Sequence, residues 1–389
     1  MNVDERIAQR GERLNRLTQT ARGTEMGSLL RLFWHPIAVA RELAPGAAKT
    51  VRVLGEDLTL YRGASGAPYL VGGACAHRRT VLHTGWVEGE EVRCMYHGWT
   101  YDGTGQCTLR PAETDAGLPP VRIAGYPAHE YAGLIFAYLG PAPAPAFDLP
   151  RKDVFEGDDR IVFARAEAWD CNWLQLVENS LDAVHVSFVH QKGRSGTFID
   201  VVSDAIPTLE FEENDAGIRQ SATRGAGNVR VSDWTFPNNN HISVPGLQRD
   251  DPWIDIGHWN VPVDDVTTAR MNVWSVRKTT PEADRRIRAY FEARSNYNAA
   301  DHFDELFHQN RFPDDTVMSL TSAQDYLAQR GQGVIADREN EVLGRSDAGI
   351  ALLRRVFLRE LEALEQGRPA KSWRKLERAT ELPIQVAVS

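Results

Sequence analysis

The chain lacks the features that would mark a membrane, secreted or nucleic-acid-binding protein. It has no apolar run near the roughly 18 residues that a membrane-spanning helix needs, and residues 1–6 are polar rather than the start of a signal peptide. Acidic residues outnumber basic ones, for a formal net charge of −9. Phosphate backbones are bound by basic surfaces. We therefore expect no membrane and no nucleic-acid partner.

Cysteine and nucleotide-binding glycine motifs are also scarce. Four cysteines occur in 389 residues, at positions 75, 94, 107 and 171. If two of them serve another purpose, the remaining pair is too small for a disulfide framework, which favours a reducing cytoplasm. No G-x-G-x-x-G follows a predicted strand, so we expect no flavin or nicotinamide site. Any electrons that the protein uses must come from another protein.

Two mixed cysteine–histidine pairs are the strongest signal that is present. Cys75-x-His77 is followed, after sixteen intervening residues, by Cys94-x2-His97. Two thiolates and two imidazoles can hold a Rieske-type [2Fe–2S] cluster, with the cysteines on one iron and the histidines on the other. A tetrahedral zinc site uses the same residue types, but zinc fingers pair Cys with Cys and His with His. The pattern therefore favours the cluster.

The surroundings of these pairs predict an all-β domain. Residues 51–62 alternate in polarity, glycine-containing turns follow, and residues 131–140 read as one further strand. Residues 141–146 are a proline-rich connector, which we interpret as a domain boundary. A bare electron carrier is an alternative, but Rieske proteins of cytochrome complexes have two bridging cysteines at positions that hold Thr80 and Tyr96 here.

A second histidine pair lies downstream in a helix-like segment. The spacing is Asp182-x2-His185-x4-His190. Two histidines and a carboxylate from elsewhere form a facial triad for Fe(II), with open positions for dioxygen and substrate. On an ideal helix, five residues turn through about 500°, which would leave the two histidines about 140° apart. A shared metal therefore requires the helix to unwind or bulge near them.

Together these motifs resemble the terminal oxygenase (alpha) subunit of Rieske non-haem iron oxygenases, and more narrowly the phthalate dioxygenase-like branch. The resemblance covers nearly the whole chain. The motifs that carry it are Met26-Gly27 through His35-Pro36, both cysteine–histidine pairs, Glu178-Asn179-x2-Asp182-x2-His185-x4-His190, and Gln324-Asp325 ahead of residues 333–338.

This resemblance implies an α+β protein with an N-terminal arm (1–25), an all-β Rieske domain (26–146) and a catalytic domain (147–389). In the catalytic domain, a helix-grip-like antiparallel sheet would surround the mononuclear iron. The resemblance also implies a homotrimer in which each Rieske domain faces a neighbour's iron.

The resemblance also implies roles for single residues. Asp325 follows a glutamine, as the third iron ligand does in this branch; the other acidic candidates are Asp304, Glu305, Asp314, Asp315 and Asp337. Asp182 would bridge His97 of a neighbouring subunit and His185. Replacing Asp182 by alanine should then leave both metal centres loaded but stop electron transfer between them. Asn179 is a further catalytic candidate from the same motif.

The expected function is that of an aromatic ring-hydroxylating dioxygenase. It would use O2 and electrons from a separate flavin-dependent NAD(P)H reductase, with or without a ferredoxin. We expect an aromatic acid substrate, phthalate- or phenoxybenzoate-like; O- or N-demethylation is the alternative. Cavity walls are expected between about 195 and 320, at residues 234–242 and 257–263, and three arginines could each bind a carboxylate: Arg224, Arg230 and Arg249.

The last periodic segment predicts an amphipathic helix. Apolar residues recur at steps of three and four at Ile350, Leu353, Phe357, Leu361 and Leu364. Ser346 is the expected N-cap. We expect this helix to cover the catalytic domain or a subunit contact, without a chemical role.

Overall fold

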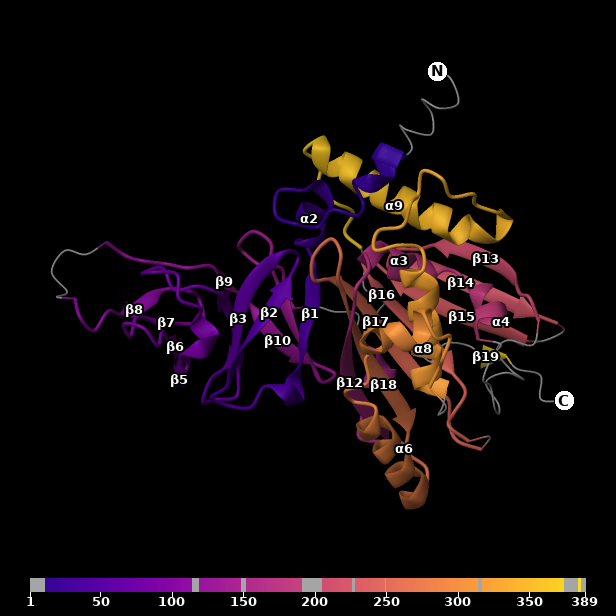
Figure 1. The fold of residues 1–389 in the computed structure, drawn as a ribbon, viewed down its shortest axis with the longest axis horizontal. Coiled ribbons are helices and arrows are strands. Elements are labelled where there is room, and N and C mark those ends of the chain that lie inside the picture. The colour runs from indigo at the N-terminus through magenta and orange to yellow at the C-terminus, as the bar shows by residue number, and fades with distance from the viewer. Residues whose placement is uncertain are drawn as a thin grey trace.

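The computed structural model describes residues 11–113, 119–147, 152–190, 205–225, 228–248, 250–313, 317–373 and 384–385. The fold is mixed α/β, with a first half made of strands and a second half made of one large antiparallel sheet and helices (Figure 1). None of the helices in these ranges combines the length and the apolar character that a membrane crossing requires.

Three small sheets form the first half. Their order is β5-β6-β7-β8 at the far end, β2-β3-β4-β9 in the middle, and β1-β11-β10 beside the second half (Figure 1). The strands are β1 (Trp34–Val39), β2 (Ala48–Val53), β3 (Glu56–Arg62), β4 (Pro68–Gly72), β5 (Trp86–Glu88), β6 (Glu91–Arg93), β7 (Thr100–Tyr101), β8 (Cys107–Leu109), β9 (Gly125–Tyr126), β10 (Ala128–Tyr131) and β11 (Leu134–Tyr138).

The second half is organised around one eight-stranded antiparallel sheet. Its order is β12-β18-β17-β16-β15-β14-β13, and β19 pairs with β15. The strands are β12 (Arg160–Trp169), β13 (Thr208–Glu213), β14 (Gly217–Arg224), β15 (Asn228–Thr235), β16 (Asn239–Val244), β17 (Ile254–Pro262), β18 (Thr268–Arg277) and β19 (Ile384–Gln385). Every residue of β17 is buried, because this strand is covered on both faces.

Helices complete the second half and the junction. The α-helices are α2 (Glu25–Leu30), α3 (Trp173–Asn179), α4 (His185–Val189), α6 (Pro281–Ala293), α7 (Phe303–Phe307), α8 (Val317–Arg330) and α9 (Ala348–Glu365). The 3₁₀ turns are η1 (Ala40–Glu42), η2 (Leu82–Thr84), η3 (Asp153–Phe155), η4 (Ala299–His302) and η5 (Arg345–Asp347). Helices α3 and α4 both contact α8, and residues of all three face the sheet across a cavity.

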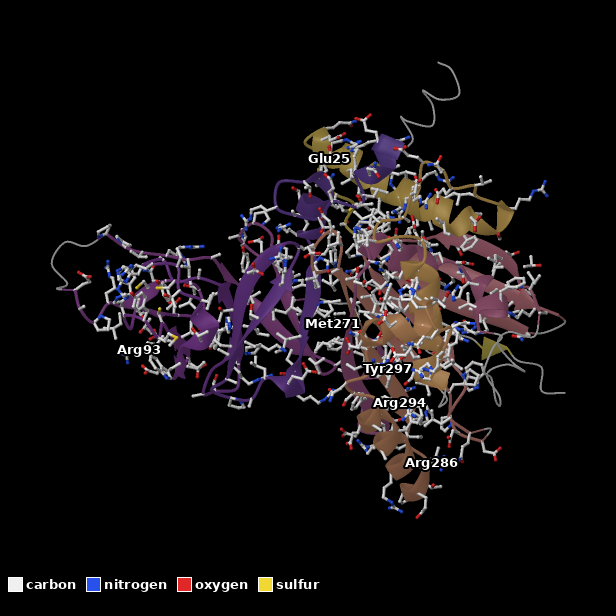
Figure 2. All side chains as sticks on the ribbon, viewed as in Figure 1. Glu25, Arg93, Met271, Arg286, Arg294 and Tyr297 are labelled. Carbon is white, nitrogen blue, oxygen red and sulfur yellow. The ribbon has the colours of Figure 1, made fainter. Side chains whose placement is uncertain are left out.

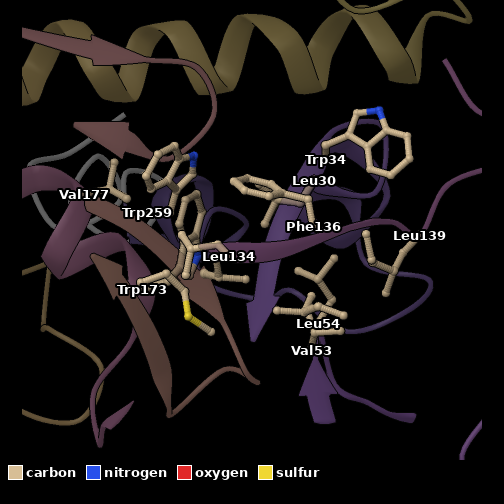
Figure 3. Packing of buried hydrophobic residues seen from close by; sticks show 14 of the residues in the cluster. Leu30, Trp34, Val53, Leu54, Leu134, Phe136, Leu139, Trp173, Val177 and Trp259 are labelled. Atoms are coloured by element: carbon tan, nitrogen blue, oxygen red, sulfur yellow. The ribbon is translucent and has the colours of Figure 1, made fainter. Parts of the chain in front are cut away.

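The two halves share one hydrophobic core. Figure 3 shows Trp34 and Phe136 of the first half in the same cluster as Trp173 and Trp259 of the second. Strand β1 lies against β17 and β18. Burial of apolar surface stabilises a structure by about 25 cal/mol per Å². The shared core therefore holds the two halves in one arrangement. The cluster loops and the catalytic half are therefore held in a fixed relative position.

The N-terminal arm is packed rather than free. Leu14 and Leu17 are buried in the shared core, and the backbone carbonyl of Leu17 accepts a hydrogen bond from Trp173 Nε1 at 3.1 Å. Leu14 and Leu17 are three positions apart in a polar segment, so both can point to the same side and pack against the core. The segment that we described as an arm therefore packs against both halves, since Arg22 also bonds Glu56 of β3 at 3.0 Å.

The predicted C-terminal helix is present, but its cap differs. Helix α9 runs Ala348–Glu365 and buries Leu353, Phe357 and Leu361. Asp347 is the N-cap residue instead of Ser346, because the 3₁₀ turn η5 precedes the helix. The Asp347 carboxylate accepts a hydrogen bond from the Gly344 amide at 2.6 Å and so closes this turn.

Candidate metal centres and substrate cavity

The two cysteine–histidine loops have the same backbone geometry. In the first, the Cys75 amide donates to the Thr80 carbonyl at 2.8 Å and the Cys75 carbonyl accepts from Arg79 at 3.0 Å. In the second, Cys94 makes the corresponding bonds with Trp99 at 2.9 Å and Gly98 at 3.0 Å. Each loop thereby presents a cysteine followed by a histidine on a tight turn.

Arg79 and Gly98 occupy equivalent positions in the two turns, and both have positive φ, 64° and 72°. This left-handed conformation suits glycine and is uncommon for arginine. Because both residues adopt it, the two loops share the same turn geometry although their residue types differ.

The cysteines and the histidines of the two loops differ in their exposure to solvent. Cys75 and Cys94 are buried, whereas His77 is exposed, and the rings of His77 and His97 lie 4.5 Å apart. Tyr101 places its hydroxyl 3.2 Å from Cys75 Sγ. Desolvation, with His77 and Arg78 nearby, holds the pKa of His97 below its ordinary range, which favours the neutral ligand form.

The donor geometry separates a two-iron cluster from a zinc ion. A tetrahedral zinc site needs its donors about 2.0–2.3 Å from one ion, so the donor atoms must crowd together. Among the described residues, the group of three or more His, Cys, Asp or Glu residues with donor atoms within 4.8 Å of one another is His185, His190 and Asp325. The four loop residues do not form such a group. They fit a dinuclear cluster better than a single ion.

The second histidine pair lies where helical structure is interrupted. Helix α3 ends at Asn179, helix α4 begins at His185 and ends at Val189, and His190 has φ −89° and ψ 21°. His190 thus leaves the helix instead of continuing it. This departure removes the angular separation that an ideal helix would impose, and the two imidazole rings lie 5.5 Å apart.

Asp325 of α8 completes the group. Its Oδ1 lies 3.6 Å from His185 Nε2 and 3.4 Å from His190 Nε2. This oxygen is buried, and within the described residues it accepts no hydrogen bond. Burial alone would raise the pKa of Asp325, but the two histidines and Arg270 outweigh it and hold the pKa far below its ordinary range. A buried anionic oxygen without a donor, facing two ring nitrogens, fits a divalent iron.

Two further contacts orient the imidazoles. Gln324 Oε1 lies 2.9 Å from His190 Nδ1. An amide oxygen only accepts, so Nδ1 carries the proton and Nε2 keeps its lone pair toward Asp325. His185 Nδ1 bonds to the backbone carbonyl of Asp182, with the same effect.

The Asp182 carboxylate holds the start of α4. Its Oδ2 is 3.7 Å from His185 Nδ1, too far for a good hydrogen bond, while Oδ1 accepts from the amides of Val184 at 3.0 Å and His185 at 3.2 Å. Because alanine would also remove these two bonds at the start of α4, Asp182→Asn is the cleaner test of electron transfer. Asn179 ends α3 and lines the cavity.

The other acidic candidates for the third ligand lie elsewhere. Asp304 and Glu305 are near His308 and Arg311 on the surface. Asp337 is exposed and accepts a hydrogen bond from Asn340 Nδ2 at 2.7 Å. Asp314 and Asp315 lie outside the described residues.

A cavity of about 150 Å³ opens between the sheet and helices α3, α4 and α8 beside Asp325. The expected wall 234–242 contributes Asn240 and Ile242, and the expected wall 257–263 contributes His258 and Asn260. Residues on alternate positions of a strand point to opposite faces, which is why only some of each segment lines the cavity. Trp234 is instead buried in the shared core.

The cavity also extends beyond the expected range of 195–320. Residues from β12, α3, α4 and α8 contribute to its lining, among them Arg165, Glu167 and Gln329. Their positions follow from how the sheet folds over the helices. No local motif marks them.

Of the three arginines proposed for a carboxylate, one lines this cavity. Arg230 does so from β15. Arg224 donates to the carbonyls of Ala205 at 3.0 Å and Ala183 at 3.1 Å, and so holds backbone. Arg249 lies outside the described residues.

Sequence reasoning missed several residues around the cavity. Arg270 lies 4.0 Å from Asp325, Gln324 bonds His190, and Asn272 bonds His258. Gln324 adjoins a proposed ligand in the sequence and could have been found from that position. Arg270 and Asn272 belong to β18, and only the pairing of β18 with β17 brings them to the site.

Comparisons with known families agree with this arrangement. Residues 33–127 match the Rieske [2Fe-2S] domain, and residues 137–381 match the family described as LigXa C-terminal domain like. These two matches correspond to the cluster loops and to the iron site with its cavity.

Several characterised proteins are similar along most of their length. The 5,5'-dehydrodivanillate O-demethylase oxygenase subunit of Sphingobium sp. strain SYK-6 is 32% identical over 93% of this chain and 82% of its own. The phenoxybenzoate dioxygenase subunit alpha of Ectopseudomonas oleovorans is 32% identical over 90% of this chain and 85% of its own.

The fold is also that of a solved oxygenase. The reduced complex between oxygenase and ferredoxin in carbazole 1,9a-dioxygenase contains a chain that matches with a TM-score of 0.63 at 21% identity, over 94% of this chain and 98% of that one. The family carries a Rieske [2Fe–2S] cluster and mononuclear Fe(II), and the residues described above suit both. The chain therefore belongs to the Rieske non-haem iron oxygenases, as a terminal oxygenase (alpha) subunit of the phthalate dioxygenase-like branch.

Proposed function

We propose that this oxygenase acts on an aromatic acid, with O2 as the oxidant and electrons from a separate NAD(P)H reductase. The observation that carries the proposal is Arg230, a half-buried arginine that lines the cavity. Its NH2 group donates to the Ser243 carbonyl at 2.9 Å. Burial and neighbouring Arg224 lower the pKa of Arg230 to about 10.

The other two arginines of the cavity already have anionic neighbours. Arg165 is 3.0 Å from Glu167, and Arg270 is 4.0 Å from Asp325. Within the described ranges, no carboxylate lies within ion-pair distance of Arg230. A cation that is partly removed from water without a counter-ion is unfavourable, and a substrate carboxylate would supply the opposite charge through charge-assisted hydrogen bonds.

The charge of the whole cavity favours the same class of substrate. Its three arginines are matched by three carboxylates, those of Glu167, Asp182 and Asp325. A divalent iron would leave an excess of positive charge. Apolar side chains are available for an aromatic ring; they include Leu176, Ile242, Val244, Ile256 and Trp274.

The roles of the chain's residues in turnover follow from these positions. His185, His190 and Asp325 would hold the iron, and Cys75, Cys94, His77 and His97 would hold the cluster. When bound, the cluster supplies single electrons and the iron activates dioxygen. Gln324 and the Asp182 carbonyl keep both iron-facing imidazole nitrogens unprotonated. Arg230 would orient the substrate, and the covered cavity would limit access of bulk water.

Two reactions fit an iron with open positions beside an aromatic acid. Ring dihydroxylation is our first expectation. O-Demethylation is the second candidate, and the similarity to the dehydrodivanillate O-demethylase subunit favours it. Substrate pose would decide between them, because the same proposed ligands serve both.

We infer a homotrimer that passes electrons between subunits, because the proposed cluster and iron residues lie in different halves of the fold. Figure 2 shows Arg93, which precedes Cys94, in the first half of the fold, and Met271 and Tyr297 in the half that contains the cavity. His97 is partly exposed in the first half, where it would face a neighbour's Asp182.

We assign residues 26–146 to the Rieske domain and 147–389 to the catalytic domain. A flavin-dependent reductase, with or without a ferredoxin, would donate the electrons. All four cysteines are unpaired, in keeping with a cytoplasmic location.

Oxygen uptake by the holoenzyme with a surrogate reductase tests the proposal. The panel comprises phthalate, 3-phenoxybenzoate and 3,4-dimethoxybenzoate, each beside its amide, which keeps the ring but lacks the negative charge. We expect uptake with at least one acid and little with the matching amide. Diol formation would identify dihydroxylation, and formaldehyde release would identify demethylation.

The variant Arg230→Met should lower kcat/KM for the acid by about 30-fold or more, because a buried charge pair is lost. Arg277→Met removes an exposed arginine from the end of β18 and should leave kcat/KM unchanged. Equal turnover of acids and amides by the wild-type protein would contradict the proposed substrate class.

A further inference from the structure

His258 faces the substrate cavity from the middle of the sheet. It lies on β17, directly opposite Asn272 of β18, and both residues line the cavity. Neither belongs to the proposed metal ligands. Their cross-strand contact determines which hydrogen-bonding group His258 offers to the cavity.

A chain of hydrogen bonds fixes the tautomer of His258. Asn272 Nδ2 donates to the backbone carbonyl of Arg270 at 3.4 Å, and a carbonyl can only accept. The amide oxygen Oδ1 of Asn272 therefore faces the other way, where it bonds His258 Nδ1. An amide oxygen also only accepts, so Nδ1 carries the proton. His258 Nε2 is left with a lone pair.

The surroundings keep His258 neutral. Burial lowers the pKa of His258 to about 3, with Arg270 as the next contributor in the same direction. Asn272 and Asp325 act in the opposite direction but are outweighed. Within the described residues, Nε2 makes no hydrogen bond. A neutral acceptor therefore lines a cavity whose proposed anchor, Arg230, is a donor.

We propose that His258 Nε2 accepts a hydrogen bond from a phenolic hydroxyl of the aromatic acid substrate. This inference rests on the proposed function, in which Arg230 binds the carboxylate of the same molecule. The hydroxyl would be the second polar anchor and would set the orientation of the ring. His258 is thus a specificity-determining residue for hydroxylated aromatic acids.

The charges near His258 narrow the kind of donor. Arg270 and Arg165 both act on this imidazole. They disfavour a cationic ammonium group but stabilise the partial negative charge that a phenol oxygen gains when its proton is shared. A second carboxylate or an ether oxygen would face the lone pair of Nε2 without a proton between them. The site therefore prefers a hydroxy acid to a dicarboxylic acid or to its methyl ether.

Calorimetric binding to the anaerobic holoenzyme, without reductase, tests this inference. Vanillate carries a phenolic hydroxyl, and 3,4-dimethoxybenzoate is the same acid with that hydroxyl methylated. We expect the wild-type protein to bind vanillate about tenfold or more tightly, because the ether leaves a buried acceptor unpaired. This comparison requires no substitution, so a folding defect cannot obscure it.

Two variants then locate the effect. His258→Phe keeps a flat ring but removes the acceptor, and it should bind the two acids with similar affinity. Arg230→Met should weaken the binding of both acids while their ratio stays near the wild-type value. If His258→Phe folds poorly by circular dichroism, Asn272→Leu, which releases the tautomer, should reduce the ratio in part.

The outcomes separate this inference from the proposed function. If the wild-type protein binds both acids equally, or prefers the ether, the role of His258 is overturned and the aromatic acid class stands. If neither acid binds but vanillamide does, the proposed substrate class fails, and the inference fails with it. Preference for vanillate that persists in His258→Phe would show that another group recognises the hydroxyl.

Discussion

At the residue scale, the hydrogen bond between Gln324 and His190 orients one of the proposed iron ligands. It couples the position of α8, which carries Asp325, to the ring orientation of His190. Partners of this kind orient a ligand and raise its basicity. The same helix thus supplies one proposed ligand and the hydrogen bond that orients another.

Gln324→Leu should weaken iron binding by about 10–100-fold, because Nδ1 of His190 loses its acceptor and the ring can rotate or change tautomer. Competition with a ferrous chelator measures this directly. Gln329→Leu is a matched control, since Gln329 is a buried glutamine of the same helix whose side chain makes no hydrogen bond to a proposed ligand among the described residues. Equal iron affinity in the two variants would contradict the assigned role.

Asp182→Asn should leave the iron and cluster contents of the protein unchanged, since an amide oxygen can still accept from the amides of Val184 and His185. Electron transfer from reduced cluster to iron should slow by about 10–100-fold, because the carboxylate charge between the centres is lost. Rapid-mixing spectroscopy of the cluster in a single turnover measures the rate. An unchanged rate would rule out a path through this carboxylate.

At the scale of elements, a buried ion network holds α3 in place. Glu178 of α3 accepts from Arg338 at 3.1 and 2.8 Å and from Arg354 of α9 at 2.6 Å. Burial raises the pKa of Glu178, but the two arginines outweigh it and bring the pKa below its ordinary range. Since Asn179 and Asp182 follow directly, this network also sets where the iron-binding segment begins.

Glu178→Gln should reduce the free energy of unfolding by about 3–5 kcal/mol at pH 7, because Arg338 remains buried without its counter-ion. Glu213→Gln, which breaks an exposed pair with Arg359, should cost about 0–1 kcal/mol. Denaturant unfolding of both variants measures the difference.

The stability that Glu178 contributes depends on pH, because only its ionised form pairs with the arginines. A depressed carboxyl pKa contributes stability above the unfolded value of about 4.3, and the contribution is lost as pH falls through the folded pKa. The gap in stability between wild type and Glu178→Gln should therefore narrow below about pH 4. A gap that widens in acid would show that Glu178 is not the ionised partner.

A second element-scale feature joins the two halves. The β2–β3 hairpin turns through Leu54 and Gly55, with φ of 50° and 75°, as in a two-residue type I′ turn. The amides of these residues donate to the carbonyls of Pro262 at 2.9 Å and Val263 at 2.8 Å. Leu54 is fully buried there. An apolar residue is unusual at the tip of a turn. Leu54 is found there because the turn packs against the second half of the fold.

At the scale of the whole molecule, a trimer with electron transfer between subunits makes a complementation prediction. Cys94→Ser should lose the cluster, and His190→Ala should lose the iron, so each variant alone should be inactive. Trimers that contain both variants should recover about a third of wild-type turnover, because one of their three pairs of neighbours joins an intact cluster to an intact iron site. Oxygen uptake by doubly tagged, co-purified assemblies measures it. Mixed assemblies without activity would place the transfer within one chain.

The sequence by itself determined the chemistry of the metal sites. Cys75-x-His77 and Cys94-x2-His97 specify their own turns, and the family resemblance carried the fold class and pointed to Asp325. Such motifs are readable because their residue types and spacings are local. Helix boundaries were harder to predict from the sequence. The N-cap of α9 is Asp347 and not Ser346, because a 3₁₀ turn precedes the helix.

Only the tertiary structure decided what surrounds the iron. Arg230, His258 and Arg270 come from three strands, and their side chains converge because the sheet pairs those strands and twists over α8. The packed N-terminal segment and the docked Leu54 turn likewise depend on contacts between residues far apart in sequence. Strand pairing is long-range, so no local pattern could say that Arg230, rather than Arg224, would face the cavity.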